Sequence, residues 1–112
     1  EKRKHPRATG RFVVHYRVLE EKNNIDITQT KDLSLGGMYL TTNRKFDPGT
    51  KLALEIRLPF DPDPIMIVGR VVDSRVIAHD LIYDTRIEFL QIDKKHINII
   101  GQTIDYYLKK RV

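Results

Sequence analysis

The sequence contains no cysteine and no tryptophan, and only 8% of its residues are aromatic. Without cysteine the chain can form neither a disulfide nor a thiolate nucleophile, which is typical of proteins from a reducing compartment. No apolar run approaches the roughly 20 residues that a membrane-spanning helix requires. These absences exclude cysteine chemistry and predict no transmembrane helix, and we expect a cytoplasmic location.

The chain has the length of one domain, 112 residues, of which 40% are hydrophobic and 31% charged. A chain of this length and composition can form one modest hydrophobic core but not two. The sequence begins at Glu1 without an initiator methionine or a signal segment, so we expect it to be a piece of a longer protein. We predict one module over residues 1–112.

Basic residues outnumber acidic ones by 20 to 15, and the net charge of +5 favours an anionic partner. Lys109, Lys110 and Arg111 close the chain, where cations complement the dipole of a helix. The first eleven residues carry a second basic cluster and few apolar anchors. We therefore predict a mobile basic arm over residues 1–11.

Six segments rich in β-branched and aromatic residues predict strands. The clearest alternation is at 52–58, where every second residue is leucine or isoleucine. Turn-forming residues separate the segments, and the proline-rich stretch 59–64 predicts an extended loop. Six short antiparallel strands indicate a mainly β fold closed into a barrel over residues 12–90. The predicted strands are 12–20, 25–28, 38–40, 52–58, 65–76 and 83–90.

A helix is predicted over residues 93–110, because Ile97, Ile100, Ile104 and Leu108 recur at three- and four-residue steps. Asp93 is the expected N-cap. The apolar face should cover the open end of the barrel, and pairing with a second copy to give a homodimer stays open as an alternative. Gly101 lies inside this helix, where we expect it to permit close packing.

Two short segments carry chemistry that the predicted barrel does not explain. In the first, Arg3 and Arg7 stand four residues apart. An arginine fork can bond phosphate oxygens, or the O6/N7 edge of guanine, with two hydrogen bonds at once. The second segment is a polar, glycine-bearing turn formed by Asp32, Ser34, Gly36 and Gly37.

Written as R-x-x-x-R followed by D-x-S-x-x-G, the two segments resemble the motifs of the PilZ domain family. The resemblance covers nearly the whole chain, and the order and spacing of the motifs make it more specific than either motif alone. It implies a six-stranded barrel with a C-terminal helix that binds the bacterial second messenger cyclic di-GMP. Ordering of the arm by this ligand would then affect a neighbouring domain or a downstream partner protein.

Cyclic di-GMP presents two phosphodiesters and two guanines to a receptor. Arginines suit the phosphates and the guanine edge, and Asp32 can accept the guanine N1 and N2 hydrogens. We expect the hydroxyl of Ser34 to face phosphate or base. Gly36 and Gly37 are expected to allow positive φ and to present their amide N–H groups to the ligand. The resemblance thus implies a site of Lys2, Arg3, Arg7, Asp32, Ser34, Gly36 and Gly37, with no further cofactor and no metal.

The chain departs from the usual family pattern in two places. Many members have arginine at the position of Lys2, which is associated with binding one or two nucleotide molecules, so the stoichiometry stays open. Many also have a glycine-rich stretch before a phenylalanine in the sixth strand, and here only Phe89 matches. Asp84 and Glu88 in that strand could repel phosphate or pair with Arg86.

Other functions are weighed against this one. Asp32 and Ser34 could simply cap a turn, as such residues often do, in a family member that binds proteins and no nucleotide. A small basic barrel could also bind single-stranded nucleic acid, but no face interleaves aromatic and basic residues. An enzyme is not expected, because no nucleophile has a recognisable partner. The histidines also lack metal-ligand spacing, at His5, His15, His79 and His96.

Overall fold

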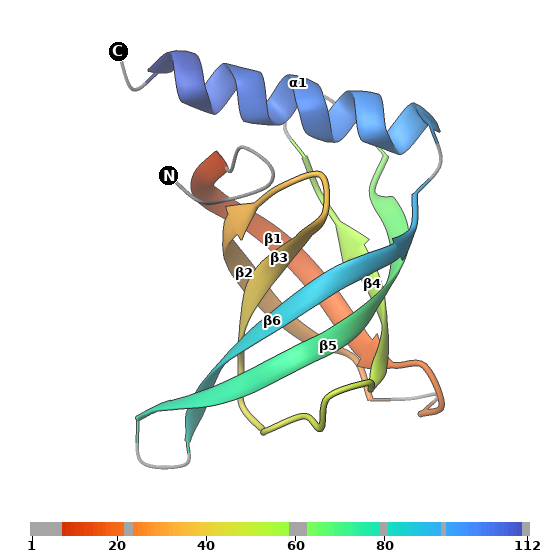
Figure 1. The fold of residues 1–112 in the computed structure, drawn as a ribbon, viewed down its shortest axis with the longest axis vertical. Helices are drawn as coiled ribbons and strands as arrows, with labels where there is room; N and C mark the ends of the chain where they lie inside the picture. The colour runs from red at the N-terminus through yellow and green to blue at the C-terminus, as the bar shows by residue number, and fades with distance from the viewer. Residues whose placement is uncertain (1–7, 22–23, 59–62, 79–80, 93, 111–112) are drawn as a thin grey trace.

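The computed structural model describes residues 8–21, 24–58, 63–78, 81–92 and 94–110. It consists of a β-barrel with a helix across one end (Figure 1). The mainly β fold with a C-terminal helix is the architecture predicted from the sequence. The elements are β1 (Ala8–Val18), β2 (Asp26–Leu33), β3 (Gly37–Thr42), β4 (Lys51–Ile56), β5 (Ile65–Ala78), β6 (Ile82–Gln91) and α1 (Lys94–Lys110).

The strands form a closed barrel in the order β1-β2-β3-β6-β5-β4, and every neighbouring pair is antiparallel. The alternation of side chains defines the inside. Leu33, Met38, Ile87 and Val71 follow one another in register across β2, β3, β6 and β5, and each is at most 1% exposed. A slip of one residue would turn such a row outward, so burial fixes the register.

A chain of buried hydroxyls crosses the barrel near the opposite end from α1. Ser74 Oγ lies 2.5 Å from Thr85 Oγ1, which lies 2.9 Å from Thr42 Oγ1, and Thr42 donates to the carbonyl of Arg44 at 2.9 Å. Because each hydroxyl has one proton, this direction makes Thr85 the donor to Thr42 and Ser74 the donor to Thr85. The polar groups are thereby satisfied without water.

Helix α1 closes the other end of the barrel, as predicted. Ile100 and Ile104 are 0% and 4% exposed and belong to the same core cluster as the strand residues. Gly101 does not serve close packing, because a Cβ built there meets nothing within 4 Å. Among the described residues, no helix has the length and apolar character needed to cross a lipid bilayer.

The strand boundaries differ from the predicted ones in places that matter for the site. β1 begins at Ala8, so residues 8–11 are strand and not part of an arm. β2 continues through Asp32 and Leu33, which leaves only residues 34–36 between β2 and β3. β5 and β6 extend to Ala78 and from Ile82, and form a long ribbon. Asp93, the expected N-cap, lies outside the described residues.

Candidate functional site

The connection between β2 and β3 is organised by the side chain of Ser34, which is 3% exposed. Its hydroxyl donates to the carbonyl of Gly37 and accepts from the amides of Gly36 and Gly37, each at 3.2 Å. The backbone N–H of Ser34 also donates to the Gly37 carbonyl at 2.9 Å. Ser34 therefore holds the turn closed from the inside.

These bonds change the roles expected for three residues. A hydroxyl has one proton and two lone pairs, and the turn uses all three at Ser34. The amide N–H groups of Gly36 and Gly37 point at that hydroxyl, so they are not presented to a ligand as expected. Ser34 is accordingly a residue that shapes the turn.

Gly37 is required by the approach of β6. A Cβ at Gly37 would collide with the backbone carbonyl oxygen of Ile87, and its φ is not positive, contrary to our expectation. The amide of Phe89 in β6 donates to the carbonyl of Gly36 at 2.9 Å. The turn is therefore fastened to β6, and a side chain at Gly37 would push the two apart.

Asp32 lies on the outer face of the barrel, next to the turn. It is half-buried, whereas its neighbours Leu33 and Ser34 are buried. In register it stands opposite Thr9 of β1 on one side and Tyr39 of β3 on the other. Tyr39 in turn stands opposite Arg86 of β6. A carboxylate, an aromatic ring and a guanidinium thus follow one another across three strands.

Tyr39 was not singled out for this site from the sequence. The signal was present, because Met38 and Leu40 are buried core residues and the residue between them in a strand must face outward. What the sequence could not show is the register that sets Tyr39 opposite Asp32.

The carboxylate that β6 places beside the turn, that of Glu88, is neutralised by a residue of β5. Glu88 stands opposite Gly37 on one side and Arg70 on the other, and its carboxylate forms an ion pair with Arg70. The sequence left open whether this carboxylate repels phosphate or pairs with Arg86, and the partner that the structure shows is Arg70. Both side chains are partly exposed, so the pair adds little to stability. It does remove the uncompensated negative charge that would repel a phosphate from this side.

Lys2, Arg3 and Arg7 lie outside the described residues. The structure does place the strand that follows them, because Ala8 and Thr9 of β1 stand opposite Leu33 and Asp32 of β2. The strand that continues from the R-x-x-x-R segment therefore flanks the candidate site directly.

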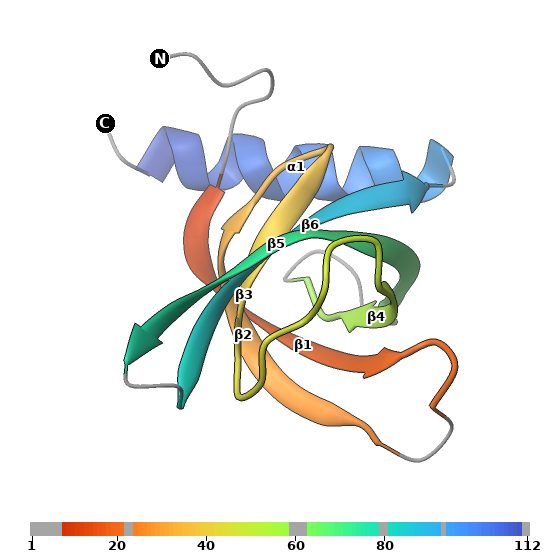
Figure 2. The same ribbon diagram turned by 60° about the horizontal axis from the view of Figure 1, so that its bottom comes forward.

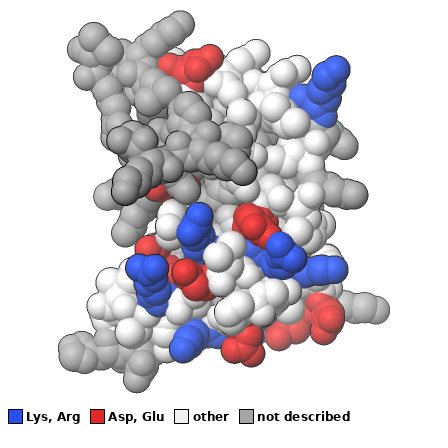
Figure 3. Space-filling view, in the orientation of Figure 1, with Lys and Arg blue, Asp and Glu red and all other residues white. Residues whose placement is uncertain are grey.

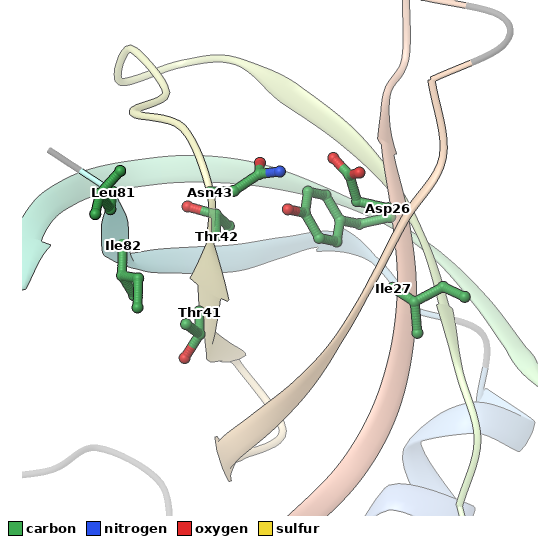
Figure 4. Close-up of a pocket in the computed structure, with 8 residues that line it drawn as sticks. Asp26, Ile27, Thr41, Thr42, Asn43, Leu81 and Ile82 are labelled. Atoms are coloured by element: carbon green, nitrogen blue, oxygen red, sulfur yellow. The ribbon is translucent and has the colours of Figure 1, made fainter. Parts of the chain in front are cut away.

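A pocket of about 180 Å³ lies far from this turn, at the other ends of β2 and β3. Burial and the neighbouring carboxylate of Asp26 raise the pKa of Tyr16 in its wall to about 12, with Arg44 opposing the shift. Asp26 is six residues from Asp32, which along a strand is about 20 Å. The pocket is therefore separate from the candidate site. Its lining residues are Tyr16, Asp26, Ile27, Thr41, Thr42, Asn43, Leu81 and Ile82 (Figure 4).

The surface chemistry supports neither a metal centre nor a uniformly basic groove in the parts described. Among the described residues, no three acidic or histidine side chains cluster closely enough to hold a metal ion. On the face shown in Figure 3, acidic and basic side chains are interspersed over the lower part of the barrel. A nucleic-acid groove calls for one sign of charge, which this part of the surface does not have.

Comparison with known structures shows the same fold in proteins of low sequence identity. Bacillus subtilis MotI/DgrA, an inhibitor of motility, matches with a TM-score of 0.79 at 20% identity, over 100% of this chain and 54% of that one. The PilZ domain of Escherichia coli YcgR, with c-di-GMP, matches with 0.71 at 13% identity, over 99% and 95%. The MrkH-c-di-GMP complex of K. pneumonia matches with 0.73 at 20% identity, over 99% and 55%.

The chain spans about half of the MotI and MrkH chains and almost all of the isolated YcgR domain. A search of curated proteins gives no match. The sequence model of the PilZ domain matches residues 1–106. The barrel, the terminal helix and this match together show that the chain belongs to the PilZ domain family.

Proposed function

We propose that this domain is a cytoplasmic receptor module for cyclic di-GMP. Arg3, Arg7 and Asp32 contact the nucleotide, and Ser34, Gly36 and Gly37 give the turn its shape. Membership of the family supports this function. So does the fold shared with two structures that contain c-di-GMP.

The observation that carries the proposal is the register of β1 against β2. Thr9 stands opposite Asp32, and Ala8 stands opposite Leu33. Arg7 directly precedes Ala8 in the sequence, and consecutive Cα atoms are about 3.8 Å apart. The strand that continues directly from Arg7 therefore lies beside the strand that carries Asp32, which supports the assignment of Arg7 to this site.

The outer face beside Asp32 suits a guanine. The carboxylate can accept the N1 and N2 hydrogens of the base, and Tyr39 on the adjacent strand offers an aromatic face within the same row. The ion pair with Arg70 compensates the charge of the neighbouring Glu88 carboxylate. Phosphate contacts are assigned to Arg3 and Arg7, whose forks match its oxygens.

Binding would bring the R-x-x-x-R segment into contact with the barrel and so change the surface offered to a neighbouring domain or a partner protein. Lys2 precedes the first arginine and is the position at which we expect the number of bound nucleotides to be set. Calorimetric titration of the wild-type domain with cyclic di-GMP would give both the affinity and that number.

The decisive experiment compares arginine variants in the same titration. We expect Arg3→Ala and Arg7→Ala each to weaken binding by about 2 to 4 kcal/mol, roughly 30- to 700-fold, because each removes charge-assisted bonds from a partly desolvated site. Arg75→Ala is the matched control, since this side chain is 81% exposed and lies on the ribbon of β5 and β6. Its affinity should equal that of the wild type.

Unchanged affinity in both arm variants would refute the assignment of the arginines. Titration with a single-stranded oligonucleotide separates the two classes of anionic ligand. Binding of the oligonucleotide as tightly as the dinucleotide, with steep dependence on salt, would favour a nucleic-acid module instead.

A further inference from the structure

The ribbon formed by β5 and β6 projects beyond the barrel at the end away from α1 (Figures 1 and 2). The pairing of β4 with β5 ends at Lys51 and Arg70. At the next residue, the N–H and C=O of Val71 bond to Thr50 and Gly49, each at 2.8 Å. Beyond Val71, β5 continues to Ala78 with β6 as its partner.

The other edge of β6 is occupied, because β3 pairs with it as far as Thr42 and Tyr83. Within the described part of the chain, residues 72–78 of β5 therefore have a strand neighbour on one side and none on the other. An open strand edge presents backbone N–H and C=O groups that can pair with another strand. The side chains along this edge determine which strand can pair with it.

The charges on the edge are opposite in sign and two residues apart. Asp73 and Arg75 share the outer face of β5, because Ser74 between them is buried. Their side chains approach each other to 3.9 Å, and in register they stand opposite Arg86 and Asp84 of β6, respectively. The side chains are nevertheless 39% and 81% exposed, so they can also contact groups on a strand that pairs with the open edge.

A second copy of the same edge is complementary to these charges. If two β5 edges run antiparallel with a two-fold axis at Ser74, Asp73 of each copy stands opposite Arg75 of the other. We propose that this domain self-associates through residues 72–76 of β5 in that register, extending the ribbon across two molecules. The interface is isologous, so each favourable contact occurs twice.

Other registers are less favourable. Moving the axis to Arg75 would set the two Arg75 side chains against each other, and like charges directly opposite one another destabilise a strand pair. With the axis at Ser74, Val76 stands opposite Val72 of the second copy. Val76 is 55% exposed in the single chain, so this contact would cover part of its apolar surface.

The proposal does not depend on nucleotide binding. The ribbon lies at the opposite end of the barrel from the turn at residues 34–36 (Figure 1). A contact confined to one strand is small, so the association should be weak and should depend on protein concentration.

Reversing the charge at residue 73 or at residue 75 tests the proposed register directly. Sedimentation velocity over a concentration series should show a dimer for the wild type and a monomer for Asp73→Arg and for Arg75→Asp, since each change creates like-charged pairs. An equimolar mixture of the two variants should form a heterodimer, because every pair is then of opposite sign again. The double variant should dimerise like the wild type.

Ile97→Glu is the control for pairing through α1, where Ile97 is 39% exposed. This variant should still dimerise, and circular dichroism should show all variants folded. A monomeric wild type at every concentration would overturn the proposal. So would dimerisation by either single charge variant alone, or loss of the dimer in Ile97→Glu with both charge variants unaffected.

Discussion

Asp32 and Ser34 lie two residues apart but differ in what their side chains contact. The hydroxyl of Ser34 is buried and fully used within the turn. Asp32 is half-buried on the outer face, opposite Tyr39. The difference separates a residue that shapes the site from one that can read a base, and substitution should distinguish them.

We predict that Asp32→Ala weakens cyclic di-GMP binding and reduces discrimination against cyclic di-AMP, because adenine lacks the N1–H and N2–H donor pair. The melting temperature should change little. Ser34→Ala is the comparison: it leaves two amides without an acceptor and should lower the stability by about 1 to 3 kcal/mol. Calorimetry with both dinucleotides and thermal unfolding of both variants check this. A destabilised Asp32→Ala protein with unchanged selectivity would assign Asp32 to the turn instead.

Tyr16 predicts a change of stability at high pH. Burial and Asp26 raise its pKa to about 12 in the folded chain, against 10.0 for an ordinary tyrosine. The folded state therefore holds the proton more tightly, and the resulting stabilisation is complete below pH 10 and lost as the pH rises through about 12. A pKa difference of about two units corresponds to roughly 3 kcal/mol in the free energy of unfolding.

Urea unfolding of the wild type and of Tyr16→Phe between neutral pH and pH 12 measures this effect. The wild type should lose more stability than the variant over the upper part of that range. Parallel curves for the two proteins would show that the phenol of Tyr16 does not contribute.

At the scale of the elements, α1 and β5 contain glycines with opposite surroundings. A Cβ at Gly101 in α1 meets nothing within 4 Å, whereas a Cβ at Gly69 in β5 collides with the Cγ2 of Ile87 and lies 3.1 Å from the Cδ1 of Leu54. Glycine in a helix interior costs about 1 kcal/mol relative to alanine. The glycine in α1 therefore lowers stability without a packing reason that the structure shows.

We predict that Gly101→Ala raises the melting temperature by about 4 to 8 °C, the change expected for about 1 kcal/mol in a domain of this size. Gly69→Ala, the matched control, should lower it because Ile87 must move. Differential scanning calorimetry of both variants measures the shifts. A decrease for Gly101→Ala would indicate a contact at α1 that this structure does not contain.

The sequence predicts which strands and helix are present better than it predicts the residues at which they begin and end. Composition, turn residues and alternation located all six strands, and the 3.6-residue period located α1, since these signals depend on which residues enter one core. The register shifts between β5 and β6 depend on how the two strands pair, and they leave no local signal in the sequence. The same holds for position 37. A glycine is required there because a side chain would collide with the backbone of Ile87, a residue fifty positions away.

For the candidate site, the sequence identified the motif residues through the resemblance and their chemistry. It predicted Ser34 as a ligand contact because a hydroxyl in a polar turn is equally suited to both roles. Only the bonds to Gly36 and Gly37 distinguish them. The position of Tyr39 opposite Asp32 likewise required the register of β2 against β3.

At the scale of the whole molecule, the barrel is closed by strands that are distant in sequence. β1 pairs with β4, and β3 pairs with β6. Such pairings form slowly, because the entropy of closing long loops is lost before the contacts are gained. The closed order nevertheless gives every strand two neighbours within the barrel itself, and leaves an open edge where β5 extends beyond it.

The hydrogen bond from Phe89 to Gly36 has a consequence for the growing chain on the ribosome. Within the domain, the turn lies between β2 and β3, but the strand that fastens it, β6, is synthesised after β3, β4 and β5. A nascent chain that has not yet released β6 lacks both this bond and the strand against which Gly37 packs. We therefore expect the proposed binding site to form only after β6 has been synthesised.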